Sequence, residues 1–200
     1  MSSIRSLSLC IGVFRPTAGS SFIPTPAEII KKKAIINVRN HNSNDCFRYS
    51  ILAALHPATN HRNHPYTYNK YLNELDMTGI QTPVALSSIP KFEIRNPTIS
   101  VNVLVYEKKD LIPVYTSKFC NQRPNHINLL LLSKGDKFHY TLITSLSRLV
   151  DDRSQHNGKT FVCKYYLHPF VTNTVSRITF PNAVGIPPNT SSIPRKVRTF

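Results

Sequence analysis

The sequence predicts an α+β domain, in which N-terminal helices pack on an antiparallel sheet of four to five strands. One amphipathic helical pattern covers residues 46–55 and stops at Pro57. Alternating apolar runs, typical of half-buried strands, follow between residues 99 and 143. A chain of 200 residues with 40% hydrophobic content can bury one substantial core, so we expect a single domain.

The first half of the chain is predicted to hold most of the helices. A short strand over residues 34–38 leads through polar residues 39–43 into the helix at 46–55. The stretch from Tyr66 to Leu75 carries aromatic and leucine residues at helical spacing, which predicts a second, shorter helix. Residues 89–94 are predicted to be a connector.

The second half is predicted to hold the main strands. Residues 99–106 alternate and are rich in β-branched side chains, and residues 111–115 give a further strand after a charged turn. Two apolar runs, 127–132 and 138–143, are separated by a short polar loop with one glycine. That spacing predicts an antiparallel hairpin.

Composition divides the chain into three parts. Fifteen prolines against six glycines suggest many irregular connections, and the prolines gather at residues 20–26 and 181–194. We therefore predict a poorly ordered N-terminal segment over 1–30, an α+β core over 31–152 and a basic tail over 153–200.

A net charge of +15 favours a polyanionic partner, nucleic acid being the usual one. No acidic residue follows Asp152, so the tail would bind phosphates without reading bases. Solvated lysines are the alternative for any single cluster. The candidate nucleic-acid-binding residues are Lys31, Lys32, Lys33, Arg195, Lys196 and Arg198.

Cys46 is a candidate nucleophile because it opens the predicted helix, with Asn44 or Asp45 as N-cap. Unpaired backbone N–H groups and the positive end of the helix dipole stabilise a thiolate at that position, so we expect a lowered pKa for Cys46. The alternative is that Cys46 is a small buried hydrophobe.

His139 is the candidate base. Strand alternation places it on one face of its strand with Thr141, and a histidine on a sheet facing a helix-borne cysteine would suit thiol chemistry. The alternative is a structural histidine. The third, orienting group stays open: Asn44 is one candidate, and residues 144–145 and the aspartates at 151–152 are others.

Other chemistry has little support in the sequence. Four scattered cysteines without a C-x-x-C pair fit reduced thiols in an intracellular setting, nuclear or cytoplasmic. No segment approaches the roughly 18 apolar residues that cross a membrane. A His-rich loop with His56, His61 and His64 could bind metal, but we favour an exposed connection. No phosphate-binding glycine loop occurs, so no cofactor is predicted.

A series of blocks in the sequence resembles a domain of Maverick/Polinton-type DNA transposon proteins, where it lies upstream of a protein-primed type-B DNA polymerase. The resemblance covers about Gly19 to Phe170. The blocks are Gly19–Pro24, Lys33–Val38, Asn44–Leu55, Ile89–Glu93, Ile99–Val103, Ile127–Leu132, His139–Tyr140 and Leu146–Leu149.

The resemblance implies an accessory domain that works beside a transposon-encoded DNA polymerase, and the net charge of +15 adds the expectation of a basic surface for nucleic acid. The Cys46 and His139 blocks are also similar to papain-like cysteine peptidases and deubiquitinases, which implies as the alternative a thiol hydrolase with a papain-like arrangement. Relatives continue into a zinc-binding stretch with C-x-x-C. Here only Cys163 of that stretch remains, and His156 and His168 do not complete a tetrahedral site, so no structural metal is predicted.

Overall fold

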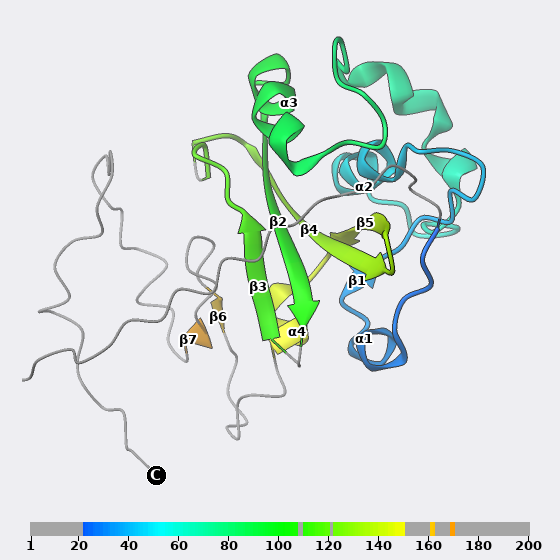
Figure 1. Ribbon diagram of the computed structural model, residues 1–200, viewed down its shortest axis with the longest axis vertical. Helices are drawn as coiled ribbons and strands as arrows, with labels where there is room; N and C mark the ends of the chain where they lie inside the picture. The colour runs from blue at the N-terminus through cyan, green and yellow to red at the C-terminus, as the bar shows by residue number, and fades with distance from the viewer. Residues whose placement is uncertain (1–21, 108–109, 121, 151–160, 163–168, 171–200) are drawn as a thin grey trace, which may run out of the picture.

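The computed structural model describes residues 22–107, 110–120, 122–150, 161–162 and 169–170. A five-stranded sheet in the order β1-β5-β4-β2-β3 forms its centre. In the view of Figure 1, α2 and α3 lie in the upper half and α1 and α4 in the lower half. The strands are β1 Ile35–Ile36, β2 Ile99–Glu107, β3 Asp110–Tyr115, β4 Asn125–Lys134 and β5 Lys137–Ile143. The α-helices are α1 Ala27–Lys32, α2 Cys46–Leu55, α3 Ile89–Arg95 and α4 Leu146–Val150.

The structure confirms an α+β fold with a five-stranded sheet, but the sheet is mixed rather than antiparallel. β2 and β4 run parallel, with Ile99 opposite Asn125 and Val105 opposite Leu131. β3 returns along one side of β2 as far as Val103, the middle of that strand, and β4 then begins on the other side, opposite Ile99. Alternation of side chains reveals a strand but not its direction, which explains why the prediction of an antiparallel sheet was wrong.

Two predicted elements take different forms in the structure. Residues 89–94 belong to helix α3, not to a connector. Proline at the first turn suits a helix start, because its missing N–H group would have no partner there. Residues 66–75 form no α-helix but fold into the 3₁₀ helices η1 Pro65–Thr67 and η2 Asn69–Glu74. A further 3₁₀ turn, η3 Leu86–Ser88, precedes α3.

The core lies on both faces of the sheet. One cluster packs α2 and α3 against the face that carries Tyr140, with Phe47 of α2 edge-on to the rings of Phe92 and Tyr140. The other cluster joins Ile29 of α1 and Leu149 of α4 to the opposite face. The sheet therefore holds two layers of helices, and residues on adjacent positions of β5 enter different layers.

The described residues cover most of the predicted core but little of the predicted N-terminal segment and tail. Helix α1 crosses the predicted boundary at residue 30, so ordered structure begins before it. In the predicted tail, only the small sheet of β6 Phe161–Val162 and β7 Pro169–Phe170 is described. The tail candidates Arg195, Lys196 and Arg198 lie outside the described residues, as does Cys163.

Candidate functional site

Cys46 is the first residue of α2, as predicted, and only 1% of its surface is exposed. The N-cap is Asp45, but its side chain makes no capping hydrogen bond and instead forms an ion pair with Arg48 at 3.2 Å. The expected side-chain cap is therefore absent, because the neighbouring guanidinium takes the carboxylate. Asn44 is exposed at the end of the preceding loop. Cys46 thus lies at the N-terminus of α2, but its side chain is buried in the core.

His139 lies on β5 and is fully buried. Its Nε2 lies 2.8 Å from Oδ1 of Asn37, and the Asn37 amide donates through Nδ2 to the Ile23 carbonyl and the Thr25 hydroxyl. Since Nδ2 is the donor group of this amide, Oδ1 accepts, and Nε2 of His139 carries the proton. Nδ1 is then the basic nitrogen, and it has no hydrogen-bond partner among the described residues.

The surroundings of His139 keep the ring neutral. Burial, and to a smaller extent the neighbouring His41 ring, lower the pKa of His139 to about 4. The Val38 backbone acts in the opposite direction, although it does not meet the geometry of a hydrogen bond to Nδ1. At neutral pH His139 therefore has an unprotonated nitrogen, which a general base requires.

Cys46 lies beside Tyr140, the residue of β5 that directly follows His139. Burial raises the pKa of Tyr140, and the nearby Cys46 raises it further, so the thiol lies beside the residue that follows His139. Alternation directs Tyr140 into the cluster with α2, whereas the His139 ring contacts Asn37 and Phe22. The structure brings His139 to Asn37 and Cys46 to Tyr140, and no hydrogen bond joins the Cys46 sulfur to Nδ1 of His139.

The orienting partner of His139 is Asn37, which the sequence did not reveal. The candidates at 144–145 use their backbone N–H groups to bond the Ala34 carbonyl, and the Ser145 hydroxyl meets Ser147. The aspartates at 151–152 lie outside the described residues. Asn37 precedes Cys46 in the chain, and only the pairing of β1 with β5 brings it to the imidazole.

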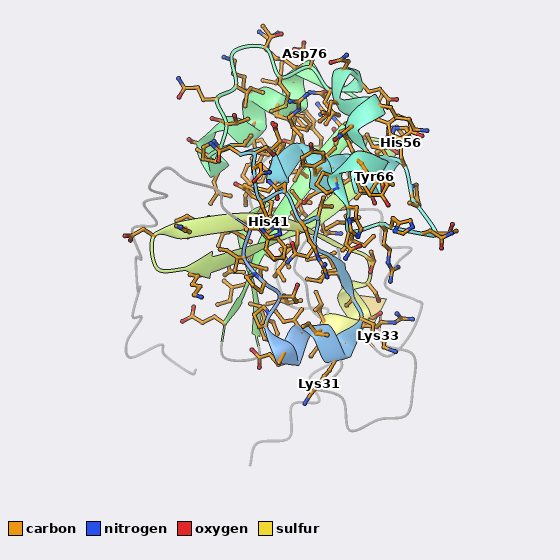
Figure 2. The ribbon with its side chains drawn as sticks, turned by 90° about the vertical axis from the view of Figure 1, so that its right-hand side faces the viewer. Lys31, Lys33, His41, His56, Tyr66 and Asp76 are labelled. Atoms are coloured by element: carbon orange, nitrogen blue, oxygen red, sulfur yellow. The ribbon has the colours of Figure 1, made fainter. Side chains whose placement is uncertain are left out.

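An open cleft of about 730 Å³ lies beside the His139–Asn37 pair. Phe22 and His41, which both interact with His139, belong to its wall, and Figure 2 shows His41 near the centre of this face of the molecule. None of the described residues that line the cleft carries a carboxylate. They are Phe22, Pro24, Thr25, Ile30, Ile35, Ile36, Asn37, Arg39, His41, Thr59, Asn60, His61, Arg62 and Asn63.

The predicted lysine cluster lies at the end of α1. Lys31 and Lys33 are exposed, and Figure 2 shows them at the lower end of the face that carries His41. Lys32 differs, because its Nζ donates to the Leu149 carbonyl at 2.6 Å and lies over the Tyr106 ring. Lys32 therefore fastens α1 to α4, and only its two neighbours offer accessible charge.

The sequence also gave no sign of the thiol–imidazole contact between Cys120 and His126. Cys120 Sγ lies 3.6 Å from Nε2 of His126, and Asn102 Nδ2 lies 3.2 Å from the same nitrogen. Asn102 Oδ1 accepts from the Ser117 N–H group, so Nδ2 donates to Nε2, and Nδ1 of His126 carries the proton facing the Ser100 hydroxyl. Cys120 is completely buried, and these contacts tie the 117–120 turn to β2 and β4.

Neither a candidate metal centre nor a helix that could span a membrane occurs in the described ranges. No group of three or more His, Cys, Asp or Glu side chains there is placed to hold a metal ion. In the predicted His-rich loop, His56 instead pairs with Glu74 at 2.6 Å and stacks on Tyr71. None of the helices in that part of the chain has the length and hydropathy of a membrane-spanning segment.

No protein-family model, curated protein or solved structure matches this chain.

Proposed function

We propose that the chain is an accessory module that binds nucleic acid, and that it serves a transposon-encoded, protein-primed DNA polymerase. The observation that carries the nucleic-acid part is the cleft that combines Arg39 and Arg62 with polar amides and has no carboxylate in its described lining. The polymerase part depends on the resemblance to Maverick/Polinton-type proteins.

The two arginines carry charge that no described residue neutralises through a salt bridge. Both side chains are exposed. Arginine forks match phosphate oxygens in geometry as well as in charge. With Lys31 and Lys33 on the same face, the cleft lies within a basic surface that a phosphate backbone can follow.

Replacing both Arg39 and Arg62 by glutamine should weaken binding of a fluorescein-labelled 12-nucleotide DNA strand about tenfold at low salt. With each phosphate contact that is lost, fewer counterions are released on binding. The slope of log K against log salt should therefore become less steep by about 0.7 per contact for a single strand. Fluorescence anisotropy at several salt concentrations measures both quantities.

The matched control replaces Lys134 and Lys137 by glutamine. Both are exposed on the β4–β5 hairpin, outside the cleft, and the change in net charge is the same. An equal loss of affinity in the two double variants would attribute binding to total charge rather than to the cleft. No binding by the unmodified chain at low salt would reject the proposed function.

A second candidate is a thiol hydrolase of Cys46, His139 and Asn37. What favours it is the bond from Nε2 of His139 to an anchored amide oxygen, which leaves Nδ1 as the basic nitrogen. Such a bond fixes the tautomer that a Cys–His hydrolase needs. In the reaction, the Cys46 proton passes to Nδ1 and the sulfur attacks an acyl carbonyl. Nδ1 then returns the proton to the leaving group, and water releases the acyl group.

Cys46 packs with Tyr140 on the α2 side of β5, whereas the His139 ring faces Asn37 on the other side of the strand. This candidate therefore requires a rearrangement that takes Cys46 out of its buried position and past β5 to Nδ1. Iodoacetamide at pH 7 tests it, with peptide mapping to compare Cys46 with the equally buried Cys120. If His139 serves as base, Cys46 should react at least tenfold faster than Cys120, and replacing His139 by glutamine should remove the difference. Equal, slow labelling of both thiols would exclude the nucleophile.

A further inference from the structure

The segment between α2 and η2 carries an aromatic cluster formed by His61, His64 and Tyr66, in which His61 and Tyr66 are exposed and His64 is half-buried. The Tyr66 ring lies 5.8 Å from His61 and 5.4 Å from His64, and the two histidine rings lie 5.6 Å apart. Tyr66 is 59% exposed. A large aromatic side chain that contributes so little to the core is available for a ligand.

Contacts below the cluster hold it in place. The buried Tyr68 donates its hydroxyl to the Arg62 carbonyl at 2.8 Å, and the Thr67 hydroxyl donates to the His61 carbonyl at 2.9 Å. His61 itself adopts φ 52°, a left-handed conformation that is uncommon outside glycine. A residue is kept in such a conformation only when its surroundings fix it, so the backbone that carries the rings is held in place before any ligand arrives.

The cluster continues directly from the basic cleft. His61 and Arg62 line the cleft, and the His61 ring contacts the Tyr66 ring outside it. Figure 2 shows Tyr66 above His41 on the face that ends in Lys31 and Lys33. Rings that can stack and a basic groove for the backbone are therefore adjacent, which is the combination found in proteins that hold single strands.

We infer that the His61–His64–Tyr66 cluster is a stacking platform for the bases of single-stranded nucleic acid, and that it makes the chain prefer a single strand to a duplex. The inference rests on the proposed function and adds the form of nucleic acid that is bound. In a duplex the bases are already stacked and paired, so their faces cannot reach Tyr66, and only the charge of the cleft contributes. A flexible single strand can lay phosphates in the cleft and one base on the ring.

The test replaces Tyr66 by alanine and measures anisotropy with a labelled dT12 strand and a labelled 12-base-pair duplex. We expect the variant to lose about tenfold in affinity for dT12, with the salt slope unchanged, because stacking involves no counterion release. Duplex affinity should stay at the level of the unmodified chain. Tyr66→Phe should retain dT12 binding, since the ring face remains.

A matched control replaces Ile94, which is 70% exposed on α3 and does not line the cleft, by alanine. Unchanged dT12 affinity in Tyr66→Ala, or equal weakening for dT12 and duplex, would overturn the platform while leaving the proposed function standing. Absence of salt-dependent binding by the unmodified chain would instead overturn both. Thermal unfolding of each variant, followed by circular dichroism, verifies that the fold is retained.

Discussion

Phe47→Ala should lower the free energy of unfolding by about 3–5 kcal/mol. The Phe47 ring is completely buried and meets Phe92 of α3 at 5.0 Å and Tyr140 of β5 at 5.3 Å between ring centroids, both nearly perpendicular. Alanine would leave a cavity at the junction of two helices and the sheet, and edge-to-face attraction would be lost as well. Urea unfolding followed by circular dichroism measures the change.

Two variants calibrate this expectation. Phe47→Leu keeps most of the apolar volume and should cost clearly less than alanine, because only the fit and the ring contacts change. Ile94→Ala removes an exposed side chain and should stay within about 0.5 kcal/mol. A loss of less than about 1 kcal/mol for Phe47→Ala would mean that α2 and α3 are not fixed to the sheet through this ring.

The elements with strong local patterns were predictable. The helix at 46–55 and the strands from residue 99 to 143 combine apolar periodicity with clear breaks, so each can be recognised from its own residues. The strand at 34–38 shrinks to Ile35–Ile36, because its pairing depends on where β5 lies rather than on its own sequence. Local pattern thus predicted the elements better than their boundaries.

Features that depend on distant residues escaped prediction. Glu93 on α3 is buried because its carboxylate accepts from the Val101 N–H group and the Tyr115 hydroxyl, both at 2.7 Å. Tyr115 lies 22 residues from Glu93 in the chain, so the local pattern around Glu93 does not reveal this partner. The parallel pairing of β4 with β2 is a similar case, because it follows from where β3 ends.

The candidate site shows the same division. Cys46 and His139 were found because residue type and local position mark a nucleophile and a base. The contact of Asn37 with His139 and the basic cleft both depend on β1, the segment near Phe22 and the loop after α2 lying close together in space. No short sequence motif predicts that arrangement. The sequence indicated positive charge in Lys31 and Lys33, whereas the structure adds the arginines of the cleft.

Acid should destabilise this protein through His139. The ring is neutral in the folded state down to about pH 4, whereas a histidine in the unfolded chain protonates near its ordinary pKa of 6.5. Above pH 6.5 both states are neutral, so His139 adds no pH dependence. Between pH 6.5 and about 4 the histidine is protonated in the unfolded state but stays neutral in the folded state. Stability should fall by about 1.4 kcal/mol per pH unit, roughly 3 kcal/mol in all.

Urea unfolding at half-unit steps from pH 7.5 to 4.5 measures this slope, and His139→Gln separates it from the contribution of carboxylates. A glutamine amide can donate to Asn37 as Nε2 does, but it has no titration in this range. We expect the slope below pH 6.5 to be shallower in His139→Gln, whatever the absolute stability of the variant. If both proteins lose stability in parallel with falling pH, His139 takes up its proton in the folded state, and the neutral base that the hydrolase candidate needs is not maintained.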